Sequence, residues 1–187
     1  MRKILILAGS PRKGGNTDRL VEAFVKGAGD GNEVEIISVA DYKVNPCIGC
    51  NSCFTREENR CFQDDDMTKI YAKLGEADTV IIASPVYFYG ISAQLKAIVD
   101  RLHTPMRNGF NIKRLGLILV GAAELPELFD AIITQYRLVL NFFKLEDAGM
   151  VLVRGAREKG DIKKEDLNNA FNLGKSLTNS KSDGKHC

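Results

Sequence analysis

A chain of 187 residues is long enough for one domain with a sizeable core and short for two. Its hydrophobic fraction of 44% and charged fraction of 27% are ordinary for a globular protein, and its formal net charge of +2 gives no general case for a nucleic-acid or acidic membrane partner. No apolar run reaches the length of a membrane span and no signal pattern precedes the first strand, so we expect a cytoplasmic protein with no membrane partner.

The first expected strand leads into a loop suited to binding phosphate. Residues 3–8 are almost wholly apolar, which is typical of a strand in the middle of a parallel sheet. Residues 9–18 then combine glycines, hydroxyls and cations and open into a helical pattern. A helix N-terminus offers free backbone N–H groups and partial positive charge to a phosphate. We interpret this stretch as the phosphate cradle of a cofactor site, with a purely structural strand-to-helix turn as the alternative.

Two better-known phosphate loops do not match this stretch. Gly9 and Gly14 have the spacing of the glycines of a Walker A loop, but Gly15 and Asn16 stand where that loop needs Lys and Ser or Thr. The dinucleotide fingerprint fails because Pro11 replaces its second glycine. Hydrolysis of ATP or GTP is therefore not expected, and a monophosphate site remains.

Helical and strand patterns then alternate along the chain. A helix follows the loop, with Asn16 or Thr17 as its expected cap and Gly27, Gly29 and Gly31 at its expected end. Further strands are expected at residues 34–39, 79–83, 115–120 and 150–153, and further helices at residues 66–75, 91–102, 125–143 and 164–177.

One stretch interrupts this alternation. Residues 41–65 are polar, cysteine-rich and aperiodic, and a long insertion of this kind in a compact domain is usually functional. We expect a single domain over residues 1–177 that contains this insertion, followed by a polar tail over residues 178–187.

Five strands alternating with helices predict right-handed βαβ units in an α/β fold. The common order for five parallel strands is 2-1-3-4-5, a flavodoxin-like three-layer sandwich whose ligand lies at the switch point between strands 1 and 3. The two most distinctive loops, residues 9–15 and 84–90, follow those two strands. Because both leave the carboxyl edge of the sheet, we expect them to meet in space.

The loop after the third strand offers three aromatic rings beside a proline and a glycine. Flat rings pack on the faces of a planar heteroaromatic ligand, and exposed backbone amides bond its polar edges. The alternative is that Tyr87, Phe88 and Tyr89 simply pack on the edge of the sheet. Because all three gather at this edge, we favour a ligand.

Together the two loops resemble the NADPH-dependent FMN reductase family of flavodoxin-like proteins, and the insertion resembles that of its iron–sulfur flavoprotein branch. The resemblance covers about residues 1–155 and implies FMN as the cofactor, in a homodimer or homotetramer with the flavin near a subunit interface. A third contact from residues 121–123 is a weaker match. By position, the resemblance implies that Ser10, Arg12, Asn16 and Thr17 hold the FMN phosphate and that Pro85, Val86, Tyr87, Phe88, Tyr89 and Gly90 line the isoalloxazine ring.

Four cysteines of the insertion have the spacing of metal ligands. Cys47, Cys50, Cys53 and Cys61 form C-x2-C-x2-C-x7-C, and the first three have the spacing of a compact iron–sulfur ligand run. The resemblance likewise implies a 4Fe–4S cluster. Zinc, reduced cysteines without a metal, and disulfide closure of the loop stay open as alternatives. Cys187, in the tail, is interpreted as incidental.

No catalytic acid or base is recognised in the sequence. His103 and His186 have no metal-ligand spacing and no nucleophile partner, and residues 64–66 fit the N-terminus of the next helix better than a metal site. This absence fits flavin chemistry, in which the cofactor reacts and the protein orients it. We therefore predict an FMN-dependent oxidoreductase that passes electrons from NAD(P)H through FMN and a 4Fe–4S cluster to a small-molecule or protein acceptor.

Three other functions stay open at this point. A cluster-free enzyme would reduce quinones, free flavin, azo or nitro compounds directly. A flavodoxin-type carrier would pass electrons between proteins without a substrate of its own. A zinc-stabilised binding module would have no redox role.

Overall fold

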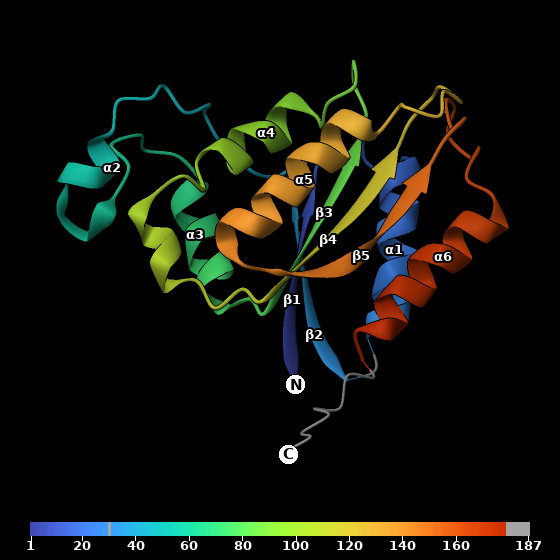
Figure 1. Ribbon diagram of the computed structural model, residues 1–187, viewed down its shortest axis with the longest axis horizontal. Coiled ribbons are helices and arrows are strands. Elements are labelled where there is room, and N and C mark those ends of the chain that lie inside the picture. Colours follow the sequence, from blue (N-terminus) through green and yellow to red (C-terminus); the bar gives the residue numbers. More distant parts are fainter. Residues whose placement is uncertain (30, 179–187) are drawn as a thin grey trace.

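The computed structural model describes residues 1–29 and 31–178, and its centre is a five-stranded parallel sheet (Figure 1). The strands are β1 (Arg2–Ala8), β2 (Asn32–Ser38), β3 (Thr79–Pro85), β4 (Arg114–Val120) and β5 (Glu146–Val153). Their order is β2-β1-β3-β4-β5, so the predicted flavodoxin-like order is confirmed. Most of the expected tail, with His186 and Cys187, lies outside the described residues.

Helices cover both faces of the sheet and make three layers (Figure 1). One face carries α1 (Asn16–Ala28) and α6 (Lys164–Ser176), and the other carries α3 (Met67–Glu76), α4 (Ala93–Asp100) and α5 (Asp130–Phe143). In β1, Leu5 and Leu7 belong to the core beneath α3, α4 and α5, whereas Ile4 and Ile6 belong to the core beneath α1 and α6. Burial on both faces explains why this strand is apolar throughout.

β1 ends opposite Ala83, two residues before the end of its neighbour β3, and this decides where their loops meet. Ala8 pairs with Ala83 at the end of β1, and the next N–H, from Gly9, donates to the Ala83 carbonyl at 2.7 Å. A Cβ on Gly9 would lie 2.6 Å from a methyl carbon of Leu95 in α4, so a glycine is needed here. The two loops singled out in the sequence therefore begin side by side.

The backbones of α1 and α6 lie unusually close together. A Cβ on Gly27 would lie 2.0 Å from the Phe171 carbonyl oxygen, and a Cβ on Gly174 would lie 2.1 Å from the Phe24 carbonyl oxygen. The expectation that Gly27 helps to end α1 is therefore wrong. It lies inside the helix, where its missing side chain lets α6 approach, and α1 ends at Ala28.

Two other helix starts differ from the sequence expectation. Gly15 is the N-cap of α1, and Asn16 and Thr17 already lie within the helix, so neither caps it. α5 begins at Asp130 rather than near residue 125, because Pro126 disfavours a helical conformation at the residue before it and a turn precedes the helix.

α4 and β5 also have bounds that the sequence pattern did not give. α4 begins at Ala93, where the Ser92 side chain accepts a hydrogen bond from the Leu95 N–H and caps the helix. β5 begins at Glu146, ahead of its apolar run, and its register with β4 shifts near Gly149, whose φ is +106°.

The cysteine-rich insertion holds only short elements. These are α2 (Ser52–Thr55) and the 3-10 helix η1 (Glu57–Asn59), and a second 3-10 helix, η2 (Pro105–Gly109), follows α4. The insertion projects from one end of the molecule, beyond α3 (Figure 1). Within residues 1–29 and 31–178, no helix has the length and apolar character needed to cross a membrane.

Candidate functional site

The loop after β1 is a tight turn held together by Ser10. The Ser10 hydroxyl donates to the Arg12 carbonyl at 2.8 Å and accepts from the Arg12 N–H at 3.2 Å. The Gly14 N–H donates to the Asp18 carboxylate at 2.6 Å, with Gly14 at a φ of +67°. Ser10 is buried and Arg12 is exposed. The hydroxyl therefore shapes the turn, and the turn presents the arginine.

A cavity of about 280 Å³ lies at the carboxyl edge of the sheet, among the loops that follow β1, β3, β4 and β5. It brings together two groups of residues from distant parts of the chain. Predicted FMN contacts that line it are Arg12, Asn16, Thr17, Pro85, Val86 and Tyr87. The two loops therefore meet in the structure, and the end of β4 and the loop after it add Val120 and Ala122 to the same cavity.

Four cations line this cavity. Arg12 and Lys13 come from the turn after β1, and Arg157 and Lys159 come from the loop after β5. Lys13 is also paired with Asp41 at 2.5 Å. A phosphate monoester carries between one and two negative charges near neutral pH, and the N-terminus of α1 adds its own partial positive charge. The cavity is therefore suited to an anionic group.

Asn16 connects the two cationic loops. Its side-chain N–H donates to the Glu158 carbonyl at 2.8 Å, and its side-chain oxygen accepts from the Gly160 N–H at 3.0 Å. Both ends of the amide are thus engaged by the loop that carries Arg157 and Lys159. The sequence analysis missed this loop, although it is rich in glycine and cations and follows a strand at the same edge.

Residues 87–90 form a two-residue hairpin with Phe88 at its tip. Tyr87 and Gly90 each donate an N–H to the other's carbonyl, at 2.9 and 3.1 Å. Phe88 and Tyr89 have φ of 48° and 63°, a conformation that side chains of this size rarely adopt. Phe88 is 98% exposed, so the alternative in which all three rings pack on the sheet is wrong. Strain of this kind often accompanies a functional role.

Buried serines fix the base of the hairpin. The Ser92 N–H donates to the Ser84 hydroxyl oxygen at 3.0 Å, and that hydroxyl donates to the Pro85 carbonyl at 2.8 Å. The Val86 N–H donates to the Val120 carbonyl at 2.7 Å. The wall of the cavity formed by the β3 loop is thereby held rigidly.

Comparison with known proteins agrees with this geometry. The family described as NADPH-dependent FMN reductase matches residues 2–171, a range that includes the turn, the hairpin and the β5 loop. The chain belongs to this family. An iron–sulfur flavoprotein of Methanocaldococcus jannaschii is 40% identical over 94% of this chain and 95% of its own, and one of Archaeoglobus fulgidus is 34% identical over 94% and 78%. The solved NAD(P)H:quinone oxidoreductase from Methanothermobacter marburgensis has a TM-score of 0.75 over 94% of this chain and 96% of its own, at 17% identity, which shows a shared fold.

As a member of the NADPH-dependent FMN reductase family, the protein is a flavin-dependent oxidoreductase with FMN as its cofactor. This excludes the zinc-stabilised module without a redox role, and it favours an enzyme over a carrier.

Four of the predicted FMN contacts lie outside the cavity at the carboxyl edge. Ser10 stands behind the turn, Phe88 is at the hairpin tip, and Tyr89 and Gly90 line a smaller hollow against α5.

The four cysteines of the insertion are free thiols, so the structure does not show the disulfide alternative. Cys47 and Cys50 are exposed, and Cys53 and Cys61 are partly buried. Hydrogen bonds from the side chain and backbone of Ser52 lower the pKa of the Cys50 thiol. Among the residues that the structure describes, no three His, Cys, Asp or Glu side chains converge as metal ligands.

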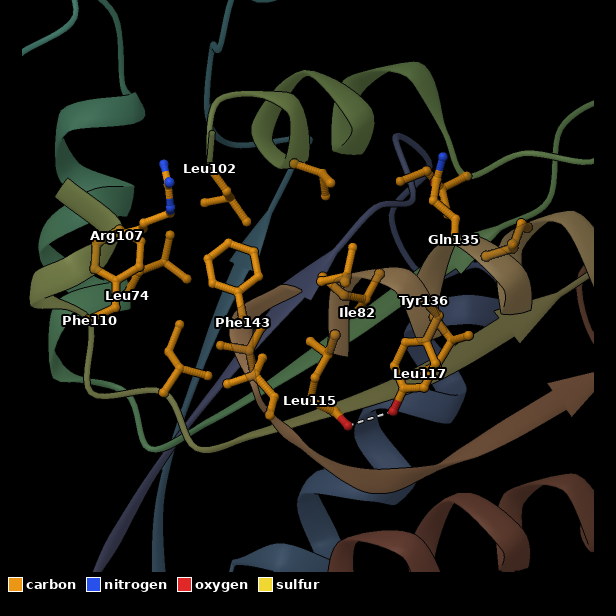
Figure 2. A pocket seen from close by; sticks show the side chains of 17 residues that line it. Leu74, Ile82, Leu102, Arg107, Phe110, Leu115, Leu117, Gln135, Tyr136 and Phe143 are labelled. Carbon is orange, nitrogen blue, oxygen red and sulfur yellow. Dashed lines mark hydrogen bonds between the residues drawn. The ribbon is translucent and has the colours of Figure 1, made fainter. Parts of the chain in front are cut away.

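A second cavity, of about 150 Å³, lies between α5 and the sheet (Figure 2). Among the described residues, all those that line this cavity are apolar except Arg107, Gln135 and Tyr136. Figure 2 shows the Tyr136 hydroxyl directed at the Leu115 carbonyl, to which it donates at 2.6 Å. Burial and the neighbouring Asp147 carboxylate raise the pKa of Tyr136, so its phenol stays a donor. An apolar cavity of this kind does not suit a phosphate.

Proposed function

We propose that the chain is an iron–sulfur flavoprotein that draws electrons from NADH or NADPH through FMN bound at the carboxyl edge of the sheet. The observation that carries this proposal is the 280 Å³ cavity, in which cations and the α1 N-terminus lie at one part and the β3 loop at another. FMN has an anionic phosphate and a planar ring, and the two parts of the cavity match its two halves. The names of the two relatives support the iron–sulfur part.

At the phosphate end, some residues bind the phosphate itself and others position the loops that bind it. Arg12, Thr17 and the first amides of α1 bind the phosphate, and Arg157 and Lys159 complete its charge balance. A hydrogen bond between ionised partners is stronger than one between neutral groups. Ser10 and Asn16 act indirectly, because their polar atoms already hold the turn and the β5 loop.

At the ring end, Pro85, Val86 and Tyr87 form the wall against which the isoalloxazine packs. Bound FMN supplies a ring system that takes up two electrons and releases them singly or as a pair. The hairpin continues past this wall to Phe88, whose ring is 98% exposed. We propose that a second copy of the chain covers this ring in a homodimer or homotetramer, since large exposed apolar side chains commonly mark interaction sites.

The insertion is proposed to hold a 4Fe–4S cluster through Cys47, Cys50, Cys53 and Cys61. The donor set fits, because a cubane cluster takes four cysteine thiolates and all four thiols are free within one segment. A cluster supplies a site for one electron at a time. The structure does not gather the four sulfur atoms, so what the protein supplies toward the cluster is the set of four thiols.

The donor and the acceptor use the same face of the flavin in turn, because the fold adds no separate nicotinamide domain among the described residues. The acceptor is a small molecule or a redox protein. A second candidate is a cluster-free reductase of quinones, flavins, azo or nitro compounds. The observation that favours it is that the cysteine side chains do not converge.

FMN binding and reductase activity test the flavin part of the proposal. Titration of FMN into apoprotein should saturate at about one FMN per chain, and the loaded protein should oxidise NADPH or NADH when an artificial acceptor is added. Saturable FMN binding without nicotinamide oxidation would favour an electron carrier. Failure to bind FMN would overturn the assignment of the cavity.

A further inference from the structure

The cysteine-rich insertion leaves and rejoins the fold at one point. The Lys43 N–H donates to the Asp66 carboxylate at 2.8 Å, and the Asp66 N–H donates to the Lys43 carbonyl at 3.1 Å. One step further along, the Asn45 N–H donates to the Asp65 carboxylate at 2.9 Å. These bonds close the neck of the loop that carries the four cysteines.

Arg101, which follows the last residue of α4, is buried against this neck. Its Nη1 lies 2.5 Å from Asp65 Oδ2 and 3.3 Å from the Asn45 carbonyl oxygen. Both side chains of the Arg101–Asp65 pair are only 3% exposed. The Arg101 carbonyl also accepts from the Tyr71 hydroxyl at 2.7 Å, which fixes it to α3. A full positive charge is thus held rigidly at the base of the insertion.

The Asp65 carboxylate accepts a hydrogen bond from Nη1 of Arg101 but not from Nε. Arg101 Nε is buried and has no hydrogen-bond partner among the described residues. Asp65 meanwhile accepts from two backbone N–H groups, those of Asn45 and Met67, so its charge is shared. A buried donor without a partner is costly, and such a group calls for an explanation such as a redox role, an ordered water or a bound ion.

Three ionisable groups face Arg101 from the elements around it. Burial lowers the pKa of Arg101, but the hydrogen bond and charge of Asp65, and more weakly the charges of Cys61 and Tyr71, raise it above its usual value. Burial raises the pKa of Tyr71 to about 12, with smaller upward effects from Cys61 and Cys53. In space, Arg101 contacts both ends of the insertion, at Asn45 two residues before Cys47 and at Asp65 four residues after Cys61.

We propose that Arg101 is a positioning residue for the cysteine-held centre: it closes the neck through Asp65 and Asn45 and holds an unpartnered N–H and a buried positive charge at the base of the segment that carries Cys47 and Cys61. This inference rests on the proposed cluster. A cluster that gains an electron becomes more negative, and a nearby buried cation stabilises that state more than the oxidised one. A hydrogen bond to a ligand sulfur acts in the same direction. Arg101 therefore raises the midpoint potential of the centre.

The test compares Arg101→Gln with two other variants of the full chain, each reconstituted with FMN, iron and sulfide under anaerobic conditions. Arg60→Gln is the matched control, because Arg60 adjoins Cys61 in sequence but is paired with Glu58 and 69% exposed, so that water screens its charge. Arg101→Lys keeps a cation beside Asp65. We expect a midpoint potential lower than wild type in Arg101→Gln, a smaller decrease in Arg101→Lys, and no change in Arg60→Gln.

A further variant keeps this test decisive if Arg101→Gln does not fold with an unpaired Asp65. Arg101→Gln combined with Asp65→Asn removes the pair without leaving a buried charge, and a smaller decrease in potential is expected, because loss of the Asp65 carboxylate offsets part of the lost positive charge. A wild-type potential in any variant that lacks the Arg101 cation and keeps its iron would overturn the inference. Loss of iron from every Arg101 variant with FMN retained would also overturn it, because Arg101 would then serve only to hold the neck of the insertion together.

Failure of the underlying proposal has a different signature. A wild-type chain that binds FMN but retains no iron and sulfide after reconstitution would overturn the proposed cluster, and the role of Arg101 with it. Iron and sulfide retained in wild type at an unchanged potential across the Arg101 variants would overturn only the role of Arg101.

Discussion

Arg12 and Asn16 both line the cavity, Arg12 from the turn after β1 and Asn16 from the start of α1, but their side chains differ in their surroundings. The Arg12 side chain is exposed on the turn, whereas both ends of the Asn16 amide are bonded to the β5 loop. Mutation of the two residues should therefore weaken FMN binding by different routes, direct for Arg12 and indirect for Asn16.

Replacing Arg12 with alanine removes one cation from the cavity lining. We expect FMN binding to weaken on the order of 1.5–3 kcal/mol, because a charge-assisted contact with the phosphate is lost. Quenching of FMN fluorescence on titration measures the dissociation constant. Lys26→Ala, in the last turn of α1, is the control for loss of a cation. An unchanged constant for Arg12→Ala would refute its role at the phosphate.

Replacing Asn16 with alanine should weaken FMN binding by about 1–2 kcal/mol, because the loop that carries Arg157 and Lys159 loses two hydrogen bonds. If Asn16 acts through that loop, its effect overlaps with that of Arg157. The double variant Asn16→Ala with Arg157→Ala should then cost less than the sum of the single variants. Strictly additive costs would indicate that Asn16 contacts the phosphate directly.

At the scale of elements, the contact between α1 and α6 depends on Gly27. Gly27→Ala would place a methyl group 2.0 Å from the Phe171 carbonyl oxygen, so the helices must move apart, and we expect destabilisation of about 2–3 kcal/mol. Gly75→Ala, in α3 with open space around it, should instead stabilise by about 0.5–1 kcal/mol. Urea unfolding measures both values. Equal effects of the two substitutions would contradict the close packing.

The neck of the insertion requires an ionised Asp65. Burial favours the neutral acid, but hydrogen bonds from the Asn45 N–H, Arg101 and the Met67 N–H outweigh it and hold the pKa of Asp65 below its usual value of 3.8. A carboxylate of lowered pKa contributes its full stabilisation above the pKa of the unfolded chain. That contribution is lost as the pH falls through the folded pKa.

We therefore expect the free energy of unfolding to fall as the pH drops below about 4, and Asp65→Asn to flatten that dependence. Urea unfolding between about pH 3 and pH 7 measures it. Asp64→Asn, one residue away and exposed, is the matched control and should leave more of the slope in place. If Asp64→Asn flattened the slope as strongly as Asp65→Asn, the ionised neck would not be its cause.

At the scale of the whole molecule, the strand order and the meeting of the two loops could be predicted because each depends on a local pattern. β1 is apolar on both faces, and each loop is marked by its own glycines and polar or aromatic residues. The bonds of Asn16 to the β5 loop could not be predicted, since they join residues 142 and 144 apart with no shared motif. Gly27 was misinterpreted for a related reason: only the presence of α6 shows why a glycine lies inside α1.

The arrangement of the proposed cofactors also emerges only in three dimensions. In Figure 1 the insertion and the β5 loop lie toward opposite ends of the molecule, with the loop between β3 and α4 between them. An FMN whose phosphate lies near the β5 loop would therefore present its ring toward the side of the insertion. This order, from phosphate to ring to cysteines, suits transfer of electrons between a flavin and a cluster.

The most direct test of this account is an absorbance spectrum of protein purified without oxygen, combined with assays of FMN, iron and acid-labile sulfide. The account predicts flavin bands over a broad brown shoulder, with about one FMN, four irons and four sulfides per chain. Flavin bands without iron would contradict the iron–sulfur flavoprotein and leave a cluster-free reductase. No flavin, even after FMN is added, would contradict the site at the carboxyl edge itself.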